Sequence, residues 1–170
     1  LEATHNLIEE NGITFDIVSI GGSPNMWEVE KIPIGTEYRI GTYIYNDRSL
    51  MERKVCREED CALTVLATVV STPTPQRAVI DAGSKVLTTD LFGLEGHGHI
   101  IDHEQLTISQ LSEEHACIVS DGPTGLSIGQ KVRIIPNHAC VVSNMVDEVV
   151  FIDGGKVLKS QTVVARGKVL

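Results

Sequence analysis

The segment Pro136–Cys140 (PNHAC) places an imidazole, His138, and a thiol, Cys140, two positions apart. It directly follows an apolar run, 131–135, that predicts a strand. If the extended conformation continues, both side chains point to the same face, with Cα atoms about 6–7 Å apart. A histidine nitrogen and a cysteine sulfur can then bind one cation at about 2.0–2.3 Å, and this pair favours Zn²⁺ over Mg²⁺ or Ca²⁺. Two protein ligands leave coordination positions open, as in a catalytic metal site. The alternative is a hydrogen-bonded core histidine beside a buried thiol.

A second candidate site is the segment Gly21-Gly22-Ser23, which follows an apolar run, 14–20, that predicts a short buried strand. Two glycines let backbone N–H groups approach an anion closely, and the serine hydroxyl adds a donor. This arrangement suits a phosphate at the carboxyl end of a barrel strand, and the alternative is an ordinary turn. Arg39, Tyr43 and Tyr45 follow in the sequence. A tyrosine hydroxyl can bind a phosphate, but tyrosine is also an ordinary strand residue.

Two further polar clusters could take part in chemistry. The segment 112–115 (SEEH) could supply a base or an anchor for a metal ligand, and the alternative is a solvated turn between strands. The segment 96–99 (GHGH), with His103 nearby, could bind a metal, and the alternative is a glycine-flanked loop. The cysteine spacings fit neither a zinc framework nor a disulfide scaffold, so we expect reduced thiols, typical of a cytoplasmic protein. The four cysteines are Cys56, Cys61, Cys117 and Cys140.

The elements that must position these residues differ between the two parts of the chain. Residues 1–12 predict an amphipathic helix, residues 14–20 a strand and residues 26–31 a helical turn, an order typical of an α/β barrel or a doubly wound sheet. From residue 36 onward, about six to nine segments rich in valine, isoleucine and threonine predict strands of a β-barrel or sandwich. Asp-Gly pairs at 121–122 and 153–154 predict hairpin turns, and a weak helix is expected over 102–111. The expected strands cover 38–47, 61–73, 77–90, 115–121, 130–146 and 147–167.

Composition excludes two classes of partner. The chain has 170 residues, enough to bury a core, and a formal net charge of −9. An acidic chain repels nucleic-acid phosphates, so we expect no nucleic acid as a partner. No apolar run approaches the roughly 20 residues that span a bilayer, so we expect no membrane association.

Taken in order, six segments resemble the D-serine dehydratase / D-threonine aldolase family of fold-type III pyridoxal-phosphate enzymes, whose architecture is similar to alanine racemase. The resemblance implies an N-terminal (β/α)₈ barrel that carries the cofactor and a C-terminal β-domain. This chain then corresponds to the C-terminal part, with 1–35 as the last barrel elements and 36–170 as a β-domain with a metal site. The segments are VSIGGSPN (18–25), YRIGTYIYND (38–47), CALTVLATVVSTP (61–73), RAVIDAGSKVLTTD (77–90), LSEEH (111–115) and VRIIPNHAC (132–140).

The resemblance also implies residue roles. Gly21, Gly22 and Ser23 match the loop at the phosphate of pyridoxal phosphate, and Tyr43 reaches the same phosphate, with Tyr45 as the competing residue. His138 and Cys140 match the catalytic metal pair for Zn²⁺ or Mn²⁺, and the HxC form resembles the zinc-type dehydratases. The implied substrates are D-3-hydroxy amino acids such as D-serine or D-threonine, which undergo dehydration or retro-aldol cleavage. The metal acts as a Lewis acid on the substrate β-hydroxyl.

One departure from the family pattern concerns the lysine that carries the cofactor, which belongs to the first barrel strand. No lysine of this chain matches its motif, so we expect the chain alone to be inactive. Two other readings stay open: a racemase of the same fold type, which needs no metal, and a non-catalytic β-domain that serves dimerisation. The resemblance implies a homodimer. The lysines are Lys31, Lys54, Lys85, Lys131, Lys156, Lys159 and Lys168.

Overall fold

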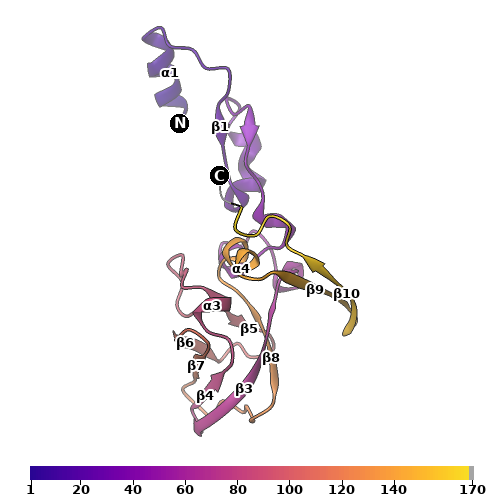
Figure 1. Ribbon diagram of the computed structural model, residues 1–170. Coiled ribbons are helices and arrows are strands. Elements are labelled where there is room, and N and C mark those ends of the chain that lie inside the picture. Colours follow the sequence, from indigo (N-terminus) through magenta and orange to yellow (C-terminus); the bar gives the residue numbers. More distant parts are fainter. Residues whose placement is uncertain (169–170) are drawn as a thin grey trace.

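The computed structural model describes residues 1–168 and is mainly β, as expected. Its centre is a six-stranded antiparallel sheet in the order β5-β8-β3-β4-β7-β6 (Figure 1). The backbone N–H of His97, just before β5, donates to the carbonyl of Ile108 in β6 at 3.0 Å, so the two edges of the sheet meet and nearly close a barrel. The strands are β3 (Val65–Thr74), β4 (Arg77–Ile80), β5 (His99–Ile100), β6 (Thr107–Leu111), β7 (Ala116–Val119) and β8 (Lys131–Ile135).

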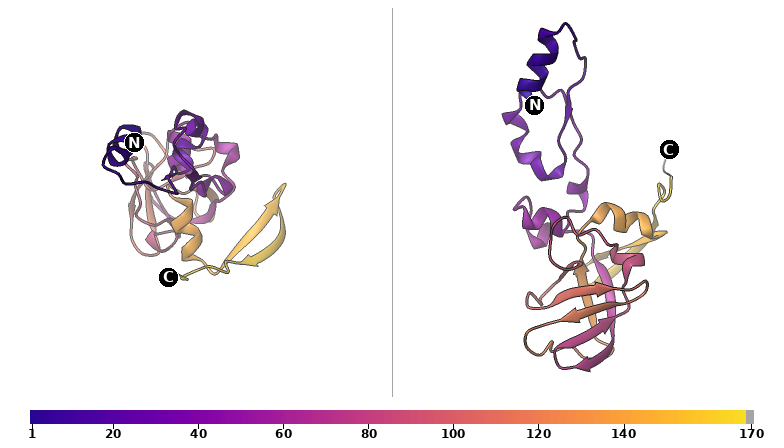
Figure 2. Two further views of the ribbon diagram at one scale, coloured as in Figure 1. Left: turned by 90° about the horizontal axis from the view of Figure 1, so that it is seen from above. Right: turned by 90° about the vertical axis from the view of Figure 1, so that its left-hand side faces the viewer.

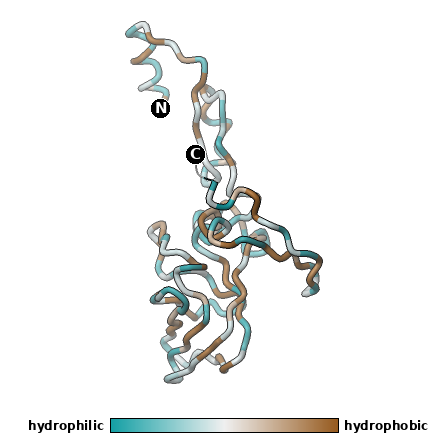
Figure 3. The backbone as a smooth tube through the Cα atoms, in the orientation of Figure 1, coloured by the Kyte–Doolittle hydropathy of each residue, from teal (hydrophilic) through white to brown (hydrophobic). Residues whose placement is uncertain are grey.

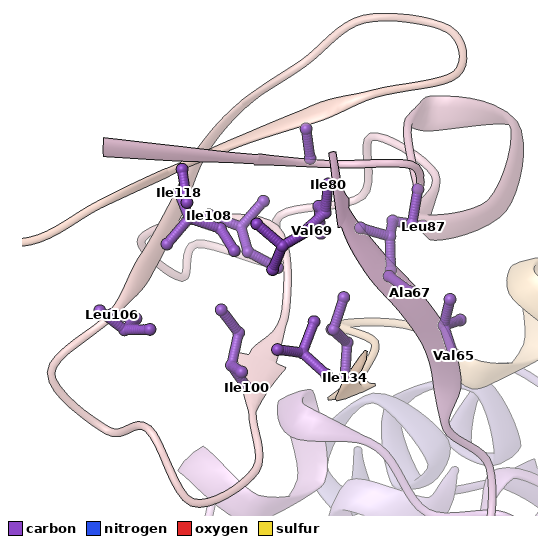
Figure 4. Packing of buried hydrophobic residues seen from close by; sticks show 14 of the residues in the cluster. Val65, Ala67, Val69, Ile80, Leu87, Ile100, Leu106, Ile108, Ile118 and Ile134 are labelled. Atoms are coloured by element: carbon purple, nitrogen blue, oxygen red, sulfur yellow. The ribbon is translucent and has the colours of Figure 1, made fainter. Parts of the chain in front are cut away.

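The barrel interior is filled by aliphatic side chains that alternate along the strands (Figure 4). In β3, Val65, Ala67 and Val69 are buried, whereas Leu66 between them is exposed, because successive strand residues point to opposite faces. Ile134 of β8 is fully buried in the same core. Burying one such isoleucine contributes about 1.5–3 kcal/mol to the free energy of unfolding. Because many such side chains fill the barrel, the barrel is the stable unit to which the surrounding loops are attached.

Short helices sit at the barrel ends and in its connections. Helix α4 lies between the barrel and the N-terminal part of the chain (Figure 1). These helices are η2 (Thr42–Ile44), α2 (Arg48–Glu52), η3 (Glu58–Asp60), α3 (Ser84–Leu87) and α4 (Ala139–Met145).

The N-terminal part extends away from the barrel (Figures 1 and 2). It contains α1 (Glu2–Glu10), β1 (Ser19–Ile20), the 3-10 helix η1 (Ser23–Lys31) and β2 (Glu37–Tyr38). Strands β1 and β2 pair in parallel, so this pair crosses the expected domain boundary at 35/36. The expected helix over 1–12 and the helical turn over 26–31 are confirmed, whereas the strand expected over 14–20 is reduced to two residues.

At the other end of the chain, β9 (Glu148–Asp153) and β10 (Lys156–Thr162) form an antiparallel hairpin that projects from the barrel (Figure 2). The hairpin predicted at 153–154 is confirmed, with Gly154 and Gly155 as its turn residues, since Asp153 pairs with Lys156. Apolar residues of the hairpin stand out in the hydropathy colouring (Figure 3). Val157 and Leu158 are 71% and 64% exposed, so a large apolar surface of the hairpin is not covered by this chain.

Several expected elements are wrong. The helix expected over 102–111 is a turn followed by β6, because residues 107–111 pair along β7. The strand expected over 38–47 is mostly replaced by η2 and the capping residue of α2, and the strand expected over 130–146 ends at Ile135 and gives way to α4. The Asp-Gly pair at 121–122 is not a hairpin turn, since the strand that follows it, β8, pairs with β3 and β5. No helix in residues 1–168 is long and apolar enough to cross a membrane.

Candidate functional site

His138 and Cys140 lie where β8 passes into α4. The extended conformation does not continue through the pair: His138 is the N-cap of α4, with φ −137° and ψ 97°, and Cys140 is the second residue of the helix. The expectation that both side chains share one strand face is therefore wrong. The pair instead occupies a strand–helix junction, where Cys140 is exposed and the His138 side chain is 24% exposed.

This junction is held by Asp47, which is completely buried. Asp47 Oδ1 accepts the backbone N–H of Leu50 at 3.1 Å and the Ser49 hydroxyl at 2.7 Å, as the N-cap of α2. Its other oxygen, Oδ2, accepts the backbone N–H of Ala139 at 3.0 Å. One carboxylate thus accepts backbone N–H groups in the first turns of both α2 and α4. It thereby ties Ala139, the residue between His138 and Cys140, to α2.

Asn137 fixes the residue before His138. It is 1% exposed, and its side-chain amide donates to the carbonyls of Asp90 and Gly96 at 3.0 and 2.9 Å. The backbone carbonyls of Pro136 and Asn137 accept the N–H groups of Arg48 and Ser49. Residues on both sides of His138 are therefore bonded to fixed backbone, which restricts the position of the imidazole.

Two side chains contact the imidazole itself. Asp90 Oδ2 lies 2.6 Å from His138 Nδ1, and the Phe92 ring packs edge-on against the imidazole with ring centroids 4.7 Å apart. A carboxylate hydrogen-bonded to one ring nitrogen orients the other nitrogen and makes it a stronger donor to a metal.

The candidate phosphate loop lies beside this metal pair. Ser23 is 3% exposed, and its hydroxyl accepts the backbone N–H of Tyr43 at 3.2 Å. The preceding residue, Thr42, has its hydroxyl 3.3 Å from Cys140 Sγ. Two consecutive residues of η2 therefore connect the glycine-rich turn to the proposed metal pair, although the sequence separates these segments by more than one hundred positions. Tyr43 is half-exposed.

The other candidate clusters have structural roles. The segment 112–115 is the turn between β6 and β7, where Ser112 N–H donates to the His115 carbonyl at 2.8 Å, so the turn interpretation is confirmed. In the segment 96–99, His99 Nε2 lies 2.6 Å from Glu58 Oε2, whereas His97 Nδ1 is buried with no hydrogen-bond partner among residues 1–168. Within the described residues, no group of three or more His, Cys, Asp and Glu side chains is placed to hold a metal.

The thiols differ in their surroundings. Burial raises the pKa of Cys61 to about 12, and burial also raises the pKa of Cys56. Cys117 is buried and accepts Arg77 Nε–H at 2.9 Å. All four cysteines are free thiols, and Cys140 is the exposed one. A buried thiol that resists ionisation is a poor metal ligand, so accessibility singles out Cys140.

Sequence reasoning missed Asp47, Thr42, Asp90 and Phe92. Asp47 carried a usable signal, because aspartate is one of the residues preferred at a helix N-cap. Thr42, Asp90 and Phe92 carried none, since they reach the site only through the closure of the barrel and its loops.

The chain belongs to the D-serine dehydratase / D-threonine aldolase family. A family model described as "Putative serine dehydratase domain" matches residues 62–152, more than half of the chain. This region contains β3 to β8, all of β9 except its last residue, and the candidate metal pair. The membership expected from the ordered segments is therefore confirmed.

Similar proteins fall into two groups by length. An uncharacterized protein of Mycobacterium tuberculosis is 40% identical over 129 residues, which are 72% of this chain and 96% of that protein. The D-threo-3-hydroxyaspartate dehydratase of Delftia sp. is 29% identical over 147 residues, 76% of this chain and 39% of the enzyme. The crystal structure of D-threonine aldolase from Filomicrobium marinum has a TM-score of 0.79 at 26% identity and covers 99% of this chain and 46% of the enzyme. The chain thus spans less than half of the enzymes that it matches.

Proposed function

We propose that this chain is the C-terminal part of a pyridoxal-phosphate- and metal-dependent lyase that acts on D-3-hydroxy amino acids. The observation that carries the proposal is the contact of Thr42 and Tyr43 with Cys140 and Ser23, respectively, which joins the candidate metal pair to the candidate phosphate loop. In this proposal residues 1–35 are the last elements of a (β/α)₈ barrel, residues 36–170 are the β-domain, and the protein works in the cytoplasm.

The donors of His138 and Cys140 fit a zinc ion. A soft thiolate and an imidazole are ligands that Zn²⁺ prefers, Cys140 is exposed, and Asp90 orients the imidazole. A metal held by this pair has coordination positions left for water or substrate, and there it supplies Lewis-acid polarisation of a bound hydroxyl. Among structures described as D-threo-3-hydroxyaspartate dehydratase, one carries a histidine-to-alanine substitution. Another, described as metal-free, carries a cysteine-to-alanine substitution two positions further on, the spacing of His138 and Cys140.

The glycine-rich turn fits the phosphate of pyridoxal phosphate. Gly21 has φ +90°, a backbone conformation that side chains disfavour, and Gly22 caps the nine-residue helix η1. Pro24 has no N–H and the Asn25 N–H donates to the Gly22 carbonyl, so the N–H groups of Gly22 and Ser23 are the donors that this helix start offers to an anion. The Ser23 hydroxyl accepts from Tyr43, so its own hydrogen is available to donate, and the Tyr43 phenol is half-exposed. Pyridoxal phosphate, when bound, supplies an electron sink for the substrate α-carbon.

The metal proposal is tested on this chain by zinc binding. We expect the chain to bind about one zinc ion, measured by competition with a chromogenic chelator, and His138→Ala and Cys140→Ala to lose that binding. Cys117→Ala is the matched control, since it removes a thiol elsewhere. Zinc binding that survives both site substitutions would contradict the proposed pair.

The enzymatic proposal is tested on the full-length protein. We expect chelators to abolish cleavage or dehydration of D-3-hydroxy amino acids and Zn²⁺ or Mn²⁺ to restore it. Metal-independent racemisation of an amino acid, without cleavage or dehydration, would favour the racemase alternative. For the chain alone, borohydride treatment in the presence of pyridoxal phosphate should leave no cofactor attached to lysine.

A homodimer and a non-catalytic dimerisation role also have support in the structure. Val157 and Leu158 expose apolar surface on a hairpin that this chain leaves uncovered, and an isolated two-stranded hairpin is marginally stable. The Mycobacterium relative is matched over 96% of its length, so a protein of little more than this domain exists. We propose that the hairpin contacts a second subunit. Enzyme assays on the full-length protein test whether the protein also has lyase activity or serves dimerisation alone.

A further inference from the structure

The interaction between Asp90 and His138 determines which imidazole nitrogen is available. Asp90 Oδ2 lies 2.6 Å from His138 Nδ1. An ionised carboxylate only accepts hydrogen bonds, so Nδ1 carries the hydrogen of the pair. A neutral imidazole with its hydrogen on Nδ1 has its lone pair on Nε2.

Four contacts make this orientation a property of the fold and not of one flexible side chain. The Asp90 backbone carbonyl accepts the Asn137 amide at 3.0 Å, which ties residue 90 to the residue next to His138. Phe92 packs edge-on against the imidazole and restricts its rotation. Arg53 donates to the Phe92 carbonyl at 3.3 Å and Nη1 of Arg53 donates to the Ser49 carbonyl at 2.6 Å, so the 90–92 loop is connected to α2.

Cys140 has its own polar neighbour. The Thr42 hydroxyl lies 3.3 Å from Cys140 Sγ and can donate to a thiolate there. Each member of the proposed metal pair therefore has one hydrogen-bonding side chain from a distant segment: Asp90 for the imidazole and Thr42 for the thiol.

We propose that Asp90 is a positioning residue that holds His138 with its hydrogen on Nδ1, so that Nε2 is the nitrogen that binds the metal. This inference rests on the proposed function, because it assigns an atom within the proposed metal pair. Removing a carboxylate that orients a metal-binding histidine lowers metal affinity by about 10–100-fold.

The test uses the full chain and two measurements. The first is the zinc dissociation constant of wild type and Asp90→Ala, from chelator competition. The second is the long-range ¹H–¹⁵N NMR spectrum of metal-free, histidine-labelled protein, which reports the hydrogen-bearing ring nitrogen. We expect wild-type His138 to carry hydrogen on Nδ1, and Asp90→Ala to shift it toward Nε2 and to bind zinc about 10–100-fold more weakly. Asp90→Asn keeps an oxygen acceptor, so it should retain the Nδ1 hydrogen.

Control variants separate the possible failures. Asp121→Asn removes an exposed carboxylate elsewhere and should leave both measurements unchanged. The Asn137 bond to residue 90 uses only the backbone of that residue, so Asp90→Ala keeps this anchor, and thermal unfolding checks that it folds. If His138→Ala binds zinc as wild type does, the proposed metal pair fails. If His138→Ala loses zinc but Asp90→Ala changes neither affinity nor the NMR signature, only the role of Asp90 is overturned. Hydrogen on Nε2 in wild type also overturns it.

Discussion

The Asp47 carboxylate accepts the backbone N–H of Ala139 at 3.0 Å across 92 positions of sequence. The same carboxylate caps α2 through Leu50. The start of α4, and with it the spacing between His138 and Cys140, is therefore fixed by a residue of another segment. Four predictions follow from this and other particular contacts.

Asp47→Asn should destabilise the protein by about 1–3 kcal/mol, because an amide cannot replace both oxygens. If the amide oxygen of the variant still accepts the Leu50 N–H at the start of α2, the NH₂ group of the variant faces the Ala139 N–H. Two hydrogen-bond donors then point at each other. Urea unfolding measures the change in the free energy of unfolding. Asp121→Asn, at an exposed position, is the control, and equal stability of the two variants would show that the Ala139 bond contributes nothing.

Gly83→Ala should cost about 1–3 kcal/mol, because a Cβ at this position would clash with the backbone carbonyl oxygens of Ser112 and Glu113. The glycine of the IDAGSK segment is thus explained by the close approach of the β6–β7 turn. Gly122→Ala is the matched control, since a Cβ there meets nothing within 4 Å. Thermal unfolding of both variants measures the loss of stability. A Gly83→Ala protein as stable as the control would contradict the expected steric clash.

His97 should make the protein less stable in mild acid. Burial lowers the pKa of His97 from its ordinary value of 6.5. Below that value the unfolded chain binds a proton that the folded imidazole resists, so the free energy of unfolding falls as the pH falls through this range. His97→Gln should reduce the difference in stability between pH 7.5 and pH 5.5, measured by urea unfolding. His115→Gln, at an exposed turn position, should leave that difference as in wild type.

Leu158→Lys should weaken self-association through the β9–β10 hairpin, because a charge replaces an apolar side chain that is 64% exposed. Light scattering coupled to size exclusion measures the mass. Ile128→Lys is the matched control, since Ile128 is 68% exposed and lies outside the hairpin. A wild-type chain that is monomeric at all accessible concentrations would remove the dimer proposal.

Much of the fold was predictable because its signals are local. Residues 65–70 (VLATVV) contain four β-branched residues, a local signal for a strand. The alternation of burial along β3 is not visible in the sequence, because Leu66 is apolar yet 65% exposed. The helix over 2–10 and the hairpin at 153–154 are equally local. Among the segments that failed, 38–47 and 102–111 have conformations that depend on remote partners: the buried Asp47 in one and the β7 edge in the other.

The sequence by itself determined the family, the β-rich core and the identities of the candidate ligands His138 and Cys140, because these depend on residue types and their order. Only the tertiary structure decided that this pair lies where a strand ends and a helix begins, that Asp90 and Thr42 contact it, and that Ser23 bonds to Tyr43, the residue after Thr42. The physical reason is the range of the interactions. A carboxylate or hydroxyl acts on an atom about 3 Å away, and that proximity across 48 to 98 positions exists only once the barrel has closed.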